Sequence, residues 1–229
     1  MAPPAPDSDF YLFANVNFKP GRYDAWQKAY DGLGEYVFAN EPTTKSYYFG
    51  VPPEYKDDIS ETTMMFAFEV YDKRESLYVT HFNSAAMGEF QRGAVPEMAT
   101  GFDLQHYASL GGFLDAPGDR RECGVMHDAH VTCKSAADRR AVADSLRRLA
   151  ASLGADGLVG AGVWTWMAYE CLDNETDLRI YGRFRDWDAM KTWDRRAEVL
   201  GLWEKHGWKE VDKVVQRALI PTGKGWLHR

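Results

Sequence analysis

The chain has 229 residues, of which 45% are hydrophobic and 14% aromatic, with a formal net charge of −7. This length is enough to bury a full core, as one large domain or two small ones, and no run of about 18 apolar residues predicts a membrane span. The acidic balance argues against a nucleic-acid partner, because phosphate binding is driven by clustered Lys and Arg.

The first half of the chain predicts one β-α-β-β-α-β unit. Residues 1–9 lack the basic and apolar stretches of a secretory signal and predict a flexible tail. Apolar alternation predicts strands, apolar spacing of three and four residues predicts helices, and Pro or Gly marks the turns. The expected strands are residues 10–18, 45–51, 66–71 and 102–114, and the expected helices are residues 22–40 and 74–90.

The junction between the third strand and the second helix gathers side chains capable of acid–base chemistry. Glu69 and Tyr71 are two residues apart, so both leave the strand on one face. His81 follows about two turns into the next helix. A strand packed under its own following helix can bring the three side chains around one space. The alternative is an ordinary strand-to-helix junction whose polar residues are solvated.

The second half repeats this unit at a constant shift of 113 residues. Apolar positions match in both helices, in an inner strand and in the last strand, all in one register. The matched positions are Leu33 with Leu146, Phe68 with Tyr181, Tyr71 with Phe184, Leu77 with Met190, Phe90 with Trp203, and residues 112–114 with 225–227. The expected helices are residues 135–153, ended by the glycine-containing segment 154–157, and 187–206, and the two inner strands are residues 163–170 and 176–185.

Each copy alone would leave one face of its sheet uncovered. A four-stranded antiparallel sheet with helices on one face exposes a large apolar patch on the other. A tandem copy supplies a second sheet within the chain. The sequence therefore predicts an α+β fold in which two ferredoxin-like repeats form an intramolecular barrel with helices outside. The expected division is residues 10–115 for the first copy, 116–122 for the linker and 123–229 for the second copy.

Short motifs of the first copy resemble the antibiotic biosynthesis monooxygenase family of dimeric α+β barrels. They are Glu41-Pro42 after the first helix, Tyr47 on the next strand, Glu69-Val70-Tyr71, and His81 shortly before Ser84. The likeness in motif covers residues 10–115, and the likeness in topology covers the whole chain. One spacing departs from the family pattern, because Leu77 and His81 are one residue further apart.

This resemblance implies oxygenation of an electron-rich aromatic polyketide, anthrone or quinol in secondary metabolism, such as antibiotic biosynthesis, without flavin, haem or metal. Such a substrate reduces molecular oxygen once deprotonated, so the protein supplies a base, stabilises the anion and excludes water. We therefore expect no cofactor, and an aromatic substrate and oxygen as partners. The expected catalytic residues are His81, Tyr71 and Glu69, and the expected substrate-binding residues are Asn15, Trp26, Tyr30, Tyr47, Trp164 and Trp166.

These residues also have structural interpretations. An imidazole titrates near neutral pH and suits a base, but the position of His81 also suits a partly exposed helix histidine. The tyrosines and Asn15 can donate hydrogen bonds to substrate oxygens, and the aromatic residues of the first helix offer flat walls or form the core. For Glu69, pairing with a Lys or Arg is favoured over a hydrogen bond from His81. Glu41 is interpreted as a helix-end or loop contact.

The second copy keeps the core spacing and loses the polar motifs. Glu69 becomes Gly182, Tyr71 becomes Phe184, and Glu41-Pro42 has no counterpart. We therefore place the chemistry in the first copy. Trp164 and Trp166 share a strand face, which predicts either an aromatic ligand wall or plain packing.

Other residues of the second copy favour structural roles. His127 and His130 are three residues apart and point to opposite strand faces, which argues against a shared metal site. Arg179, Arg183 and Arg185 suit pairing with carboxylates better than binding of an acidic substrate. Three cysteines form neither a disulfide framework nor a metal-site spacing, so we expect a reducing, cytoplasmic location.

Two further functions stay open at the level of the sequence. One is a non-oxidative cyclase, isomerase or decarboxylase that uses the same pocket, and the other is a barrel that carries a hydrophobic ligand without catalysis. No glycine-rich nucleotide fingerprint is present. Because a tandem chain is already a pseudo-dimer, we expect a monomer or a homodimer.

Overall fold

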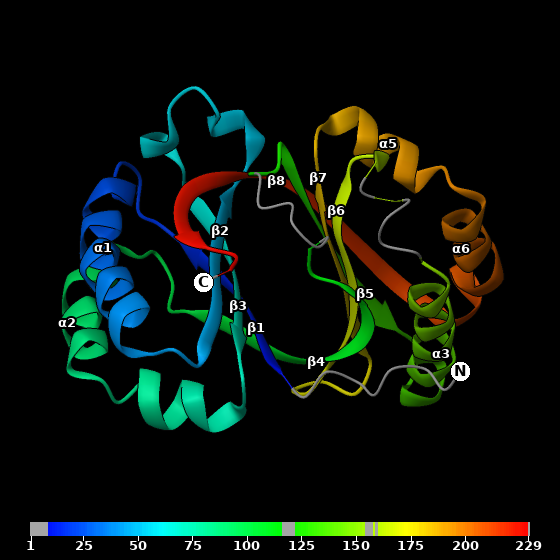
Figure 1. The fold of residues 1–229 in the computed structure, drawn as a ribbon, viewed down its shortest axis with the longest axis horizontal. Coiled ribbons are helices and arrows are strands. Elements are labelled where there is room, and N and C mark those ends of the chain that lie inside the picture. Colours follow the sequence, from blue (N-terminus) through cyan, green and yellow to red (C-terminus); the bar gives the residue numbers. More distant parts are fainter. Residues whose placement is uncertain (1–8, 116–121, 154–157, 159, 229) are drawn as a thin grey trace. The chain divides into compact units, whose positions relative to one another are not determined.

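The computed structural model describes residues 9–115, 122–153, 158 and 160–228, and the expected order of elements occurs in it twice (Figure 1). The first half contains β1 (Phe10–Asn17), α1 (Tyr23–Asn40), β2 (Thr44–Val51), β3 (Met64–Tyr71), α2 (Ala85–Ala94) and β4 (Asp103–Phe113). The second half contains β5 (Val125–Cys133), α3 (Ala136–Ser152), β6 (Val163–Cys171), β7 (Asp177–Phe184), α5 (Trp187–Asp194), α6 (Ala197–Glu210) and β8 (Val211–Trp226). The predicted tail, except Asp9, most of the predicted linker and the predicted break at 154–157 lie outside the described residues.

The strands follow the order β1-β3-β2-β8-β5-β7-β6-β4 in a closed barrel. Because the barrel is closed, the order can be started at β4, which gives β4-β1-β3-β2 followed by β8-β5-β7-β6. Each set of four is the fourth, first, third and second strand of one copy, which is the order of a ferredoxin-like sheet. The predicted α+β fold of two ferredoxin-like repeats is therefore confirmed.

Contacts divide the chain into two compact units. Among the described residues, the N-terminal unit comprises residues 9–106 and 220–228, and the C-terminal unit comprises those between 107 and 219. Strand β8 belongs to both, because it pairs with β5 up to Leu219 and with β2 from Ile220 onwards. The residue ranges expected for the two copies stay a prediction. They were defined by the repeat in sequence, whereas the two units are defined by contacts.

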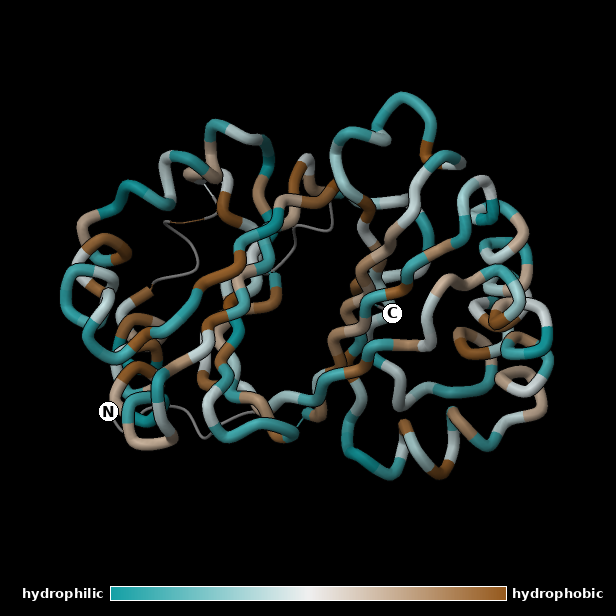
Figure 2. The backbone as a smooth tube through the Cα atoms, turned by 180° about the vertical axis from the view of Figure 1, so that it is seen from behind, coloured by the Kyte–Doolittle hydropathy of each residue, from teal (hydrophilic) through white to brown (hydrophobic). Residues whose placement is uncertain are grey.

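In the N-terminal unit, helices α1 and α2 cover one face of the sheet formed by β1, β3 and β2 (Figure 1). Brown, hydrophobic stretches follow the strands, and brown and teal alternate along the helices (Figure 2). Gly93 permits a close approach of the two helices, because a Cβ there would lie 3.0 Å from the Ala29 Cβ. The buried face of α1 has the three- and four-residue spacing expected of an amphipathic helix; its apolar members are Tyr23, Trp26, Tyr30, Leu33 and Val37.

Two predicted helices are interrupted. In place of a helix over 74–90, the chain forms a π-helical turn, η3 (Ser76–His81), and begins α2 only at Ala85. Ser84 caps this second helix by accepting the Met87 N–H at 3.1 Å, the usual role of a serine at this position. In place of a helix over 187–206, α5 ends before Arg196, whose extended backbone separates it from α6.

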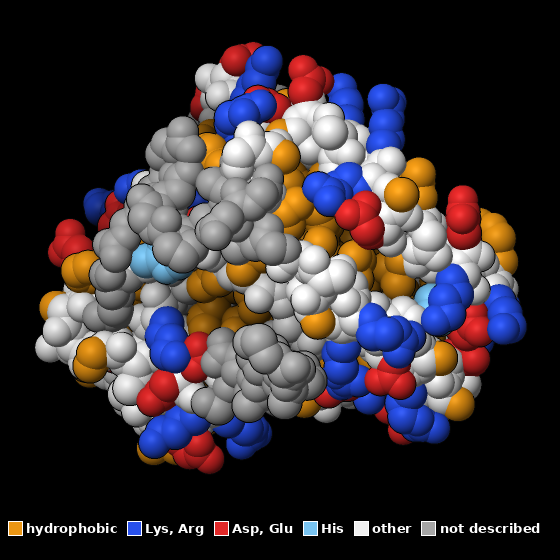
Figure 3. Space-filling model, turned by 45° about the vertical axis from the view of Figure 1, so that its right-hand side comes forward, with side chains coloured by type: hydrophobic (Ala, Val, Ile, Leu, Met, Phe, Trp, Pro, Cys, Tyr) orange, Lys and Arg blue, Asp and Glu red, His pale blue; other side chains and the backbone are white. Residues whose placement is uncertain are grey.

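On the face seen in Figure 3, acidic and basic side chains are interspersed, as is usual for a solvated surface. No helix in the described part of the chain combines the length and the apolar character needed to cross a membrane.

Candidate active site

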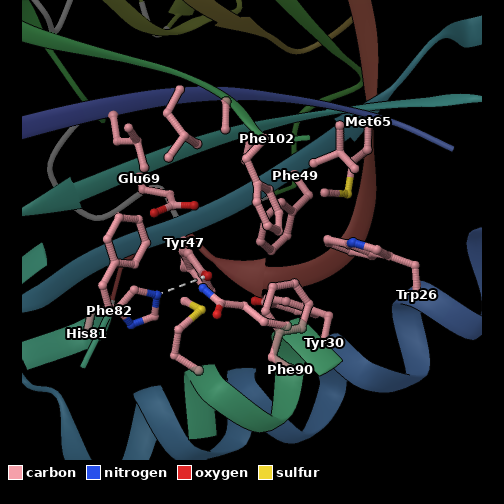
Figure 4. Close-up of a pocket in the computed structure, with 17 residues that line it drawn as sticks. Trp26, Tyr30, Tyr47, Phe49, Met65, Glu69, His81, Phe82, Phe90 and Phe102 are labelled. Carbon is pink, nitrogen blue, oxygen red and sulfur yellow. Dashed lines mark hydrogen bonds between the residues drawn. The ribbon is translucent and has the colours of Figure 1, made fainter. Parts of the chain in front are cut away.

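A cavity of about 200 Å³ lies in the N-terminal unit, between the sheet and helices α1 and α2 (Figure 4). Most of its lining side chains are apolar, and aromatic rings contribute a large share. Gln91 of α2 lines the cavity and is also exposed, so the cavity reaches the surface beside this helix. The lining side chains with polar atoms are Trp26, Tyr30, Tyr47, Glu69, His81 and Gln91.

His81 and Glu41 form a buried pair at one end of this cavity. His81 Nδ1 lies 2.8 Å from Glu41 Oε2, and the two side chains are 1% and 2% exposed. A carboxylate accepts the Nδ1–H, so it fixes the imidazole tautomer and leaves the lone pair on Nε2. Nε2 lies 3.4 Å from the Tyr47 hydroxyl (Figure 4). The pair is therefore a carboxylate-oriented imidazole whose basic nitrogen faces the cavity.

The π-helical turn η3 carries His81 to this position. The Phe82 N–H donates to the Leu77 carbonyl at 2.9 Å, a five-residue spacing that widens the turn relative to an α-helix. The extra residue between Leu77 and His81 is accommodated in this turn. Glu41 reaches the same place from the end of α1, where Pro42 cannot continue the helix.

Glu69 and Tyr71 leave β3 on one face, as their spacing predicts. Tyr71 donates its hydroxyl to Glu69 Oε2 at 2.6 Å, in place of the expected Lys or Arg partner. Glu69 lines the cavity, whereas Tyr71 packs beside it among apolar side chains. Burial raises the pKa of Glu69 to about 7, although the charge of His81 and the hydrogen bond from Tyr71 oppose this. Glu69 therefore exchanges a proton near neutral pH.

Four rings form a continuous wall from His81 to Trp26. Ring centroids lie 5.7 Å apart between His81 and Tyr47, 5.4 Å between Tyr47 and Tyr30, and 5.7 Å between Tyr30 and Trp26. Gly34 leaves room for the Tyr30 ring, because a Cβ there would lie 3.2 Å from it. Burial raises the pKa of Tyr47 well above its usual value, so its hydroxyl stays a hydrogen-bond donor.

Two buried donors of α1 line the cavity without a hydrogen-bond partner in the described residues. They are the Trp26 Nε1–H and the Tyr30 hydroxyl, and the two residues are 2% and 3% exposed. Burial raises the pKa of Tyr30 well above its usual value, so it also keeps its proton. Because an unpaired buried donor is unfavourable, both groups favour a ligand with acceptor oxygens.

The remaining predicted residues lie elsewhere. Asn15 follows the alternation of β1 to the face opposite the cavity, where it donates to Asp103 Oδ2 at 3.1 Å. Trp164 and Trp166 belong to β6 in the C-terminal unit, and Trp166 packs in its core against Trp193 at a ring distance of 5.8 Å. The other six predicted residues line the cavity or, in the case of Tyr71, adjoin it.

Glu41 is the residue whose role sequence analysis missed. It ends α1, as expected, with its N–H on the Val37 carbonyl at 2.9 Å, but its side chain pairs with His81, 40 residues further along the chain. Contacts at such a separation leave no periodic pattern. The only signal for this pair in the sequence was that Glu41 and His81 both belong to the motifs that resemble the monooxygenase family.

In the C-terminal unit, an aromatic ring occupies the space beside the position that corresponds to Glu69. A Cβ on Gly182 would lie 2.7 Å from the Phe184 ring.

Arg179 is paired as sequence analysis favoured, with its Nε and Nη2 donating to the Asp128 carboxylate at 2.5 and 2.8 Å. Across the described ranges, no three His, Cys, Asp or Glu side chains are grouped so that they could hold a metal ion.

The fold and cavity define a two-copy α+β barrel with a buried Glu41–His81 pair beside a cavity in its N-terminal unit. A "putative monooxygenase" of Lactobacillus acidophilus NCFM has 10% identity and a TM-score of 0.70, covering 93% of each chain. A "putative monooxygenase" of Fusobacterium nucleatum subsp. nucleatum has 9% identity and a TM-score of 0.75, covering 95% of this chain and 94% of its own. An anthrone oxidase-like protein has 11% identity and a TM-score of 0.60, covering 96% and 94%.

These likenesses extend over nearly the whole chain, so the fold implied by the sequence resemblance is confirmed. At identities of 9–11% they establish the fold alone. No protein-family model matches the chain, and no curated protein does.

Proposed function

We propose that the protein is a cofactor-independent monooxygenase that oxidises an electron-rich hydroxylated aromatic compound, such as an anthrone or a quinol, in the cavity of the N-terminal unit. The observation that carries this proposal is the buried Glu41–His81 pair, whose Nε2 faces an aromatic cavity beside Glu69. The fold shared with structures described as monooxygenases supports it.

In this proposal His81 deprotonates the substrate. A phenolic hydroxyl bound beside Tyr47 lies within reach of Nε2, and the Glu41 carboxylate stabilises the imidazolium that forms. Tyr47 and Tyr30 donate hydrogen bonds to the phenolate, because both keep their protons. The mostly apolar walls exclude water and strengthen these interactions.

The deprotonated substrate then reacts with oxygen. For a phenol with a free para position, the ring transfers electrons to O₂ and a C–O bond forms at the para carbon, which gives a hydroperoxide once the peroxide oxygen is protonated. Loss of the para C–H proton and cleavage of the O–O bond leave a carbonyl and release water. The phenol becomes a quinone, one oxygen atom enters the product, and the substrate supplies all four electrons. Glu69, with a pKa of about 7, is placed to deliver the proton.

Oxygen uptake with anthrone and 1-naphthol tests this proposal. We expect consumption of one O₂ per quinone formed, unchanged after treatment with a chelator and without added flavin or haem. An oxygen electrode and product analysis measure both quantities. Conversion of substrate under nitrogen without oxygen uptake would instead favour a non-oxidative step in the same cavity. Loss of activity with chelator would refute independence from a metal.

Replacement of Glu41 by glutamine tests the pair itself. Glutamine can still accept the Nδ1–H but carries no charge to stabilise the imidazolium. We expect the turnover rate to fall by about 10- to 100-fold, as for other groups that orient a functional histidine, with a smaller change in KM. Steady-state oxygen uptake separates the two constants. Wild-type turnover in Glu41→Gln would show that the carboxylate charge does not assist His81.

A further inference from the structure

We infer that Trp26 selects, through its indole N–H, substrates that carry a second acceptor oxygen remote from the hydroxyl that His81 deprotonates. This inference rests on the proposed site and deepens it, because it concerns the end of the cavity that takes no part in proton transfer. It gives the substrate class as aromatic compounds with an oxygen at each end of the ring system.

The acid–base side chains and the Trp26 indole lie at separate places in the cavity. His81 and Glu69 lie at one end, and Trp26 lies at the other, with Phe49, Phe90 and other rings between them (Figure 4). An aromatic ligand fills the middle with its own rings, so a substituent at the end remote from His81 meets the Trp26 N–H.

The Trp26 side chain is held in place by its neighbours. Its ring stacks on Tyr30 with an interplanar angle of 1° and makes edge contacts to Phe18 and Phe90 at 5.4 and 5.5 Å. The residue is 2% exposed, and its Nε1 has no hydrogen-bond partner in the part of the chain that the structure describes. A fixed, buried and unpaired donor favours an acceptor oxygen and disfavours an apolar group of the same size.

The volume guides the choice of probe. A protein cavity of about 150 Å³ lined by apolar side chains holds one benzene ring, so a cavity of about 200 Å³ has room for a probe of two fused rings. Two naphthols of matched size differ only in the group at the far end, namely 2,6-dihydroxynaphthalene and 6-methyl-2-naphthol. Calorimetric titration under nitrogen measures their affinities without turnover.

Wild-type protein is expected to bind the dihydroxy probe about three- to tenfold more tightly than the methyl probe, the ratio that one hydrogen bond gives. Trp26→Phe keeps the ring and removes the N–H, so the two affinities should become equal. Trp193→Phe, in the core of the C-terminal unit, is the matched control and should keep the preference. Equal affinities in the wild type, or a preference retained in Trp26→Phe, would overturn the inference.

A second measurement serves if Trp26→Phe does not fold. In wild-type protein with ¹⁵N-labelled tryptophan, the dihydroxy probe should shift one indole N–H resonance that the methyl probe leaves in place. Absence of such a shift would also overturn the inference. The proposed oxygenase activity can fail separately: a binding preference without oxygen uptake leaves the role of Trp26 intact, whereas oxygen uptake with no preference between the probes removes it.

Discussion

Replacement of His81 by alanine is expected to lower oxygen uptake with a phenolic substrate by about 10²–10⁴-fold, the range that a general base contributes. The imidazole is buried and held by Glu41 at 2.8 Å, and it is the only imidazole among the side chains that line the described cavity. His81→Gln should give a similar loss while filling more of the space. Initial rates with 1-naphthol, measured beside thermal unfolding, separate lost chemistry from lost folding.

A second histidine of the same unit provides the control. His106 Nε2 lies 2.8 Å from the Tyr78 hydroxyl, and the residue does not line the cavity. His106→Ala should therefore retain oxygen uptake within a few-fold of the wild-type rate. Full turnover in His81→Ala would remove the imidazole from the mechanism, and an equal loss in both variants would point to general damage to the unit.

The fold was predictable because its signals are local or repeated. The buried face of α1 and the alternation in β3 are visible within windows of a few residues, and the shift of 113 residues aligns α1 with α3 and β3 with β7. The interruption between His81 and Ala85 was not predicted, because the apolar spacing continues through it. A π-helical turn and a serine cap each change the path of the chain by only one or two residues, too little to disturb that spacing.

The site was predictable in part. Glu69 and Tyr71 lie two residues apart, so the strand period places them on one face. The inward direction of His81 and its pairing with Glu41 depend on how α1, β3 and η3 pack, which no local pattern records. The second polar end of the cavity was missed for another reason. A helical stripe of aromatic residues predicts burial, but it does not show whether the Trp26 N–H finds a partner once it is buried.

Replacement of Glu69 by glutamine is expected to change how stability depends on pH. The folded-state pKa of Glu69 is raised from 4.5 to about 7, mainly by burial, so folding favours the protonated carboxyl. The contribution of Glu69 to the free energy of unfolding is fully present below about pH 4.5 and is lost as pH rises through 7. The reason is that, over this range, the unfolded chain holds fewer protons than the folded chain. A shift of this size corresponds to about 3 kcal/mol.

Glutamine is uncharged at every pH and can still accept the hydrogen bond that Tyr71 donates to position 69. The free energy of unfolding of Glu69→Gln, relative to wild type, should therefore rise by about 3 kcal/mol between pH 4.5 and pH 8. Urea denaturation at a series of pH values measures this difference. Glu35→Gln, on the exposed side of α1, is the control. Its free energy of unfolding relative to wild type should change by less than about 0.5 kcal/mol over the same pH range. A difference for Glu69→Gln that stays flat across this range would mean that Glu69 is ionised in the folded protein at acidic pH, and it could then not deliver the proton to the peroxide near neutral pH.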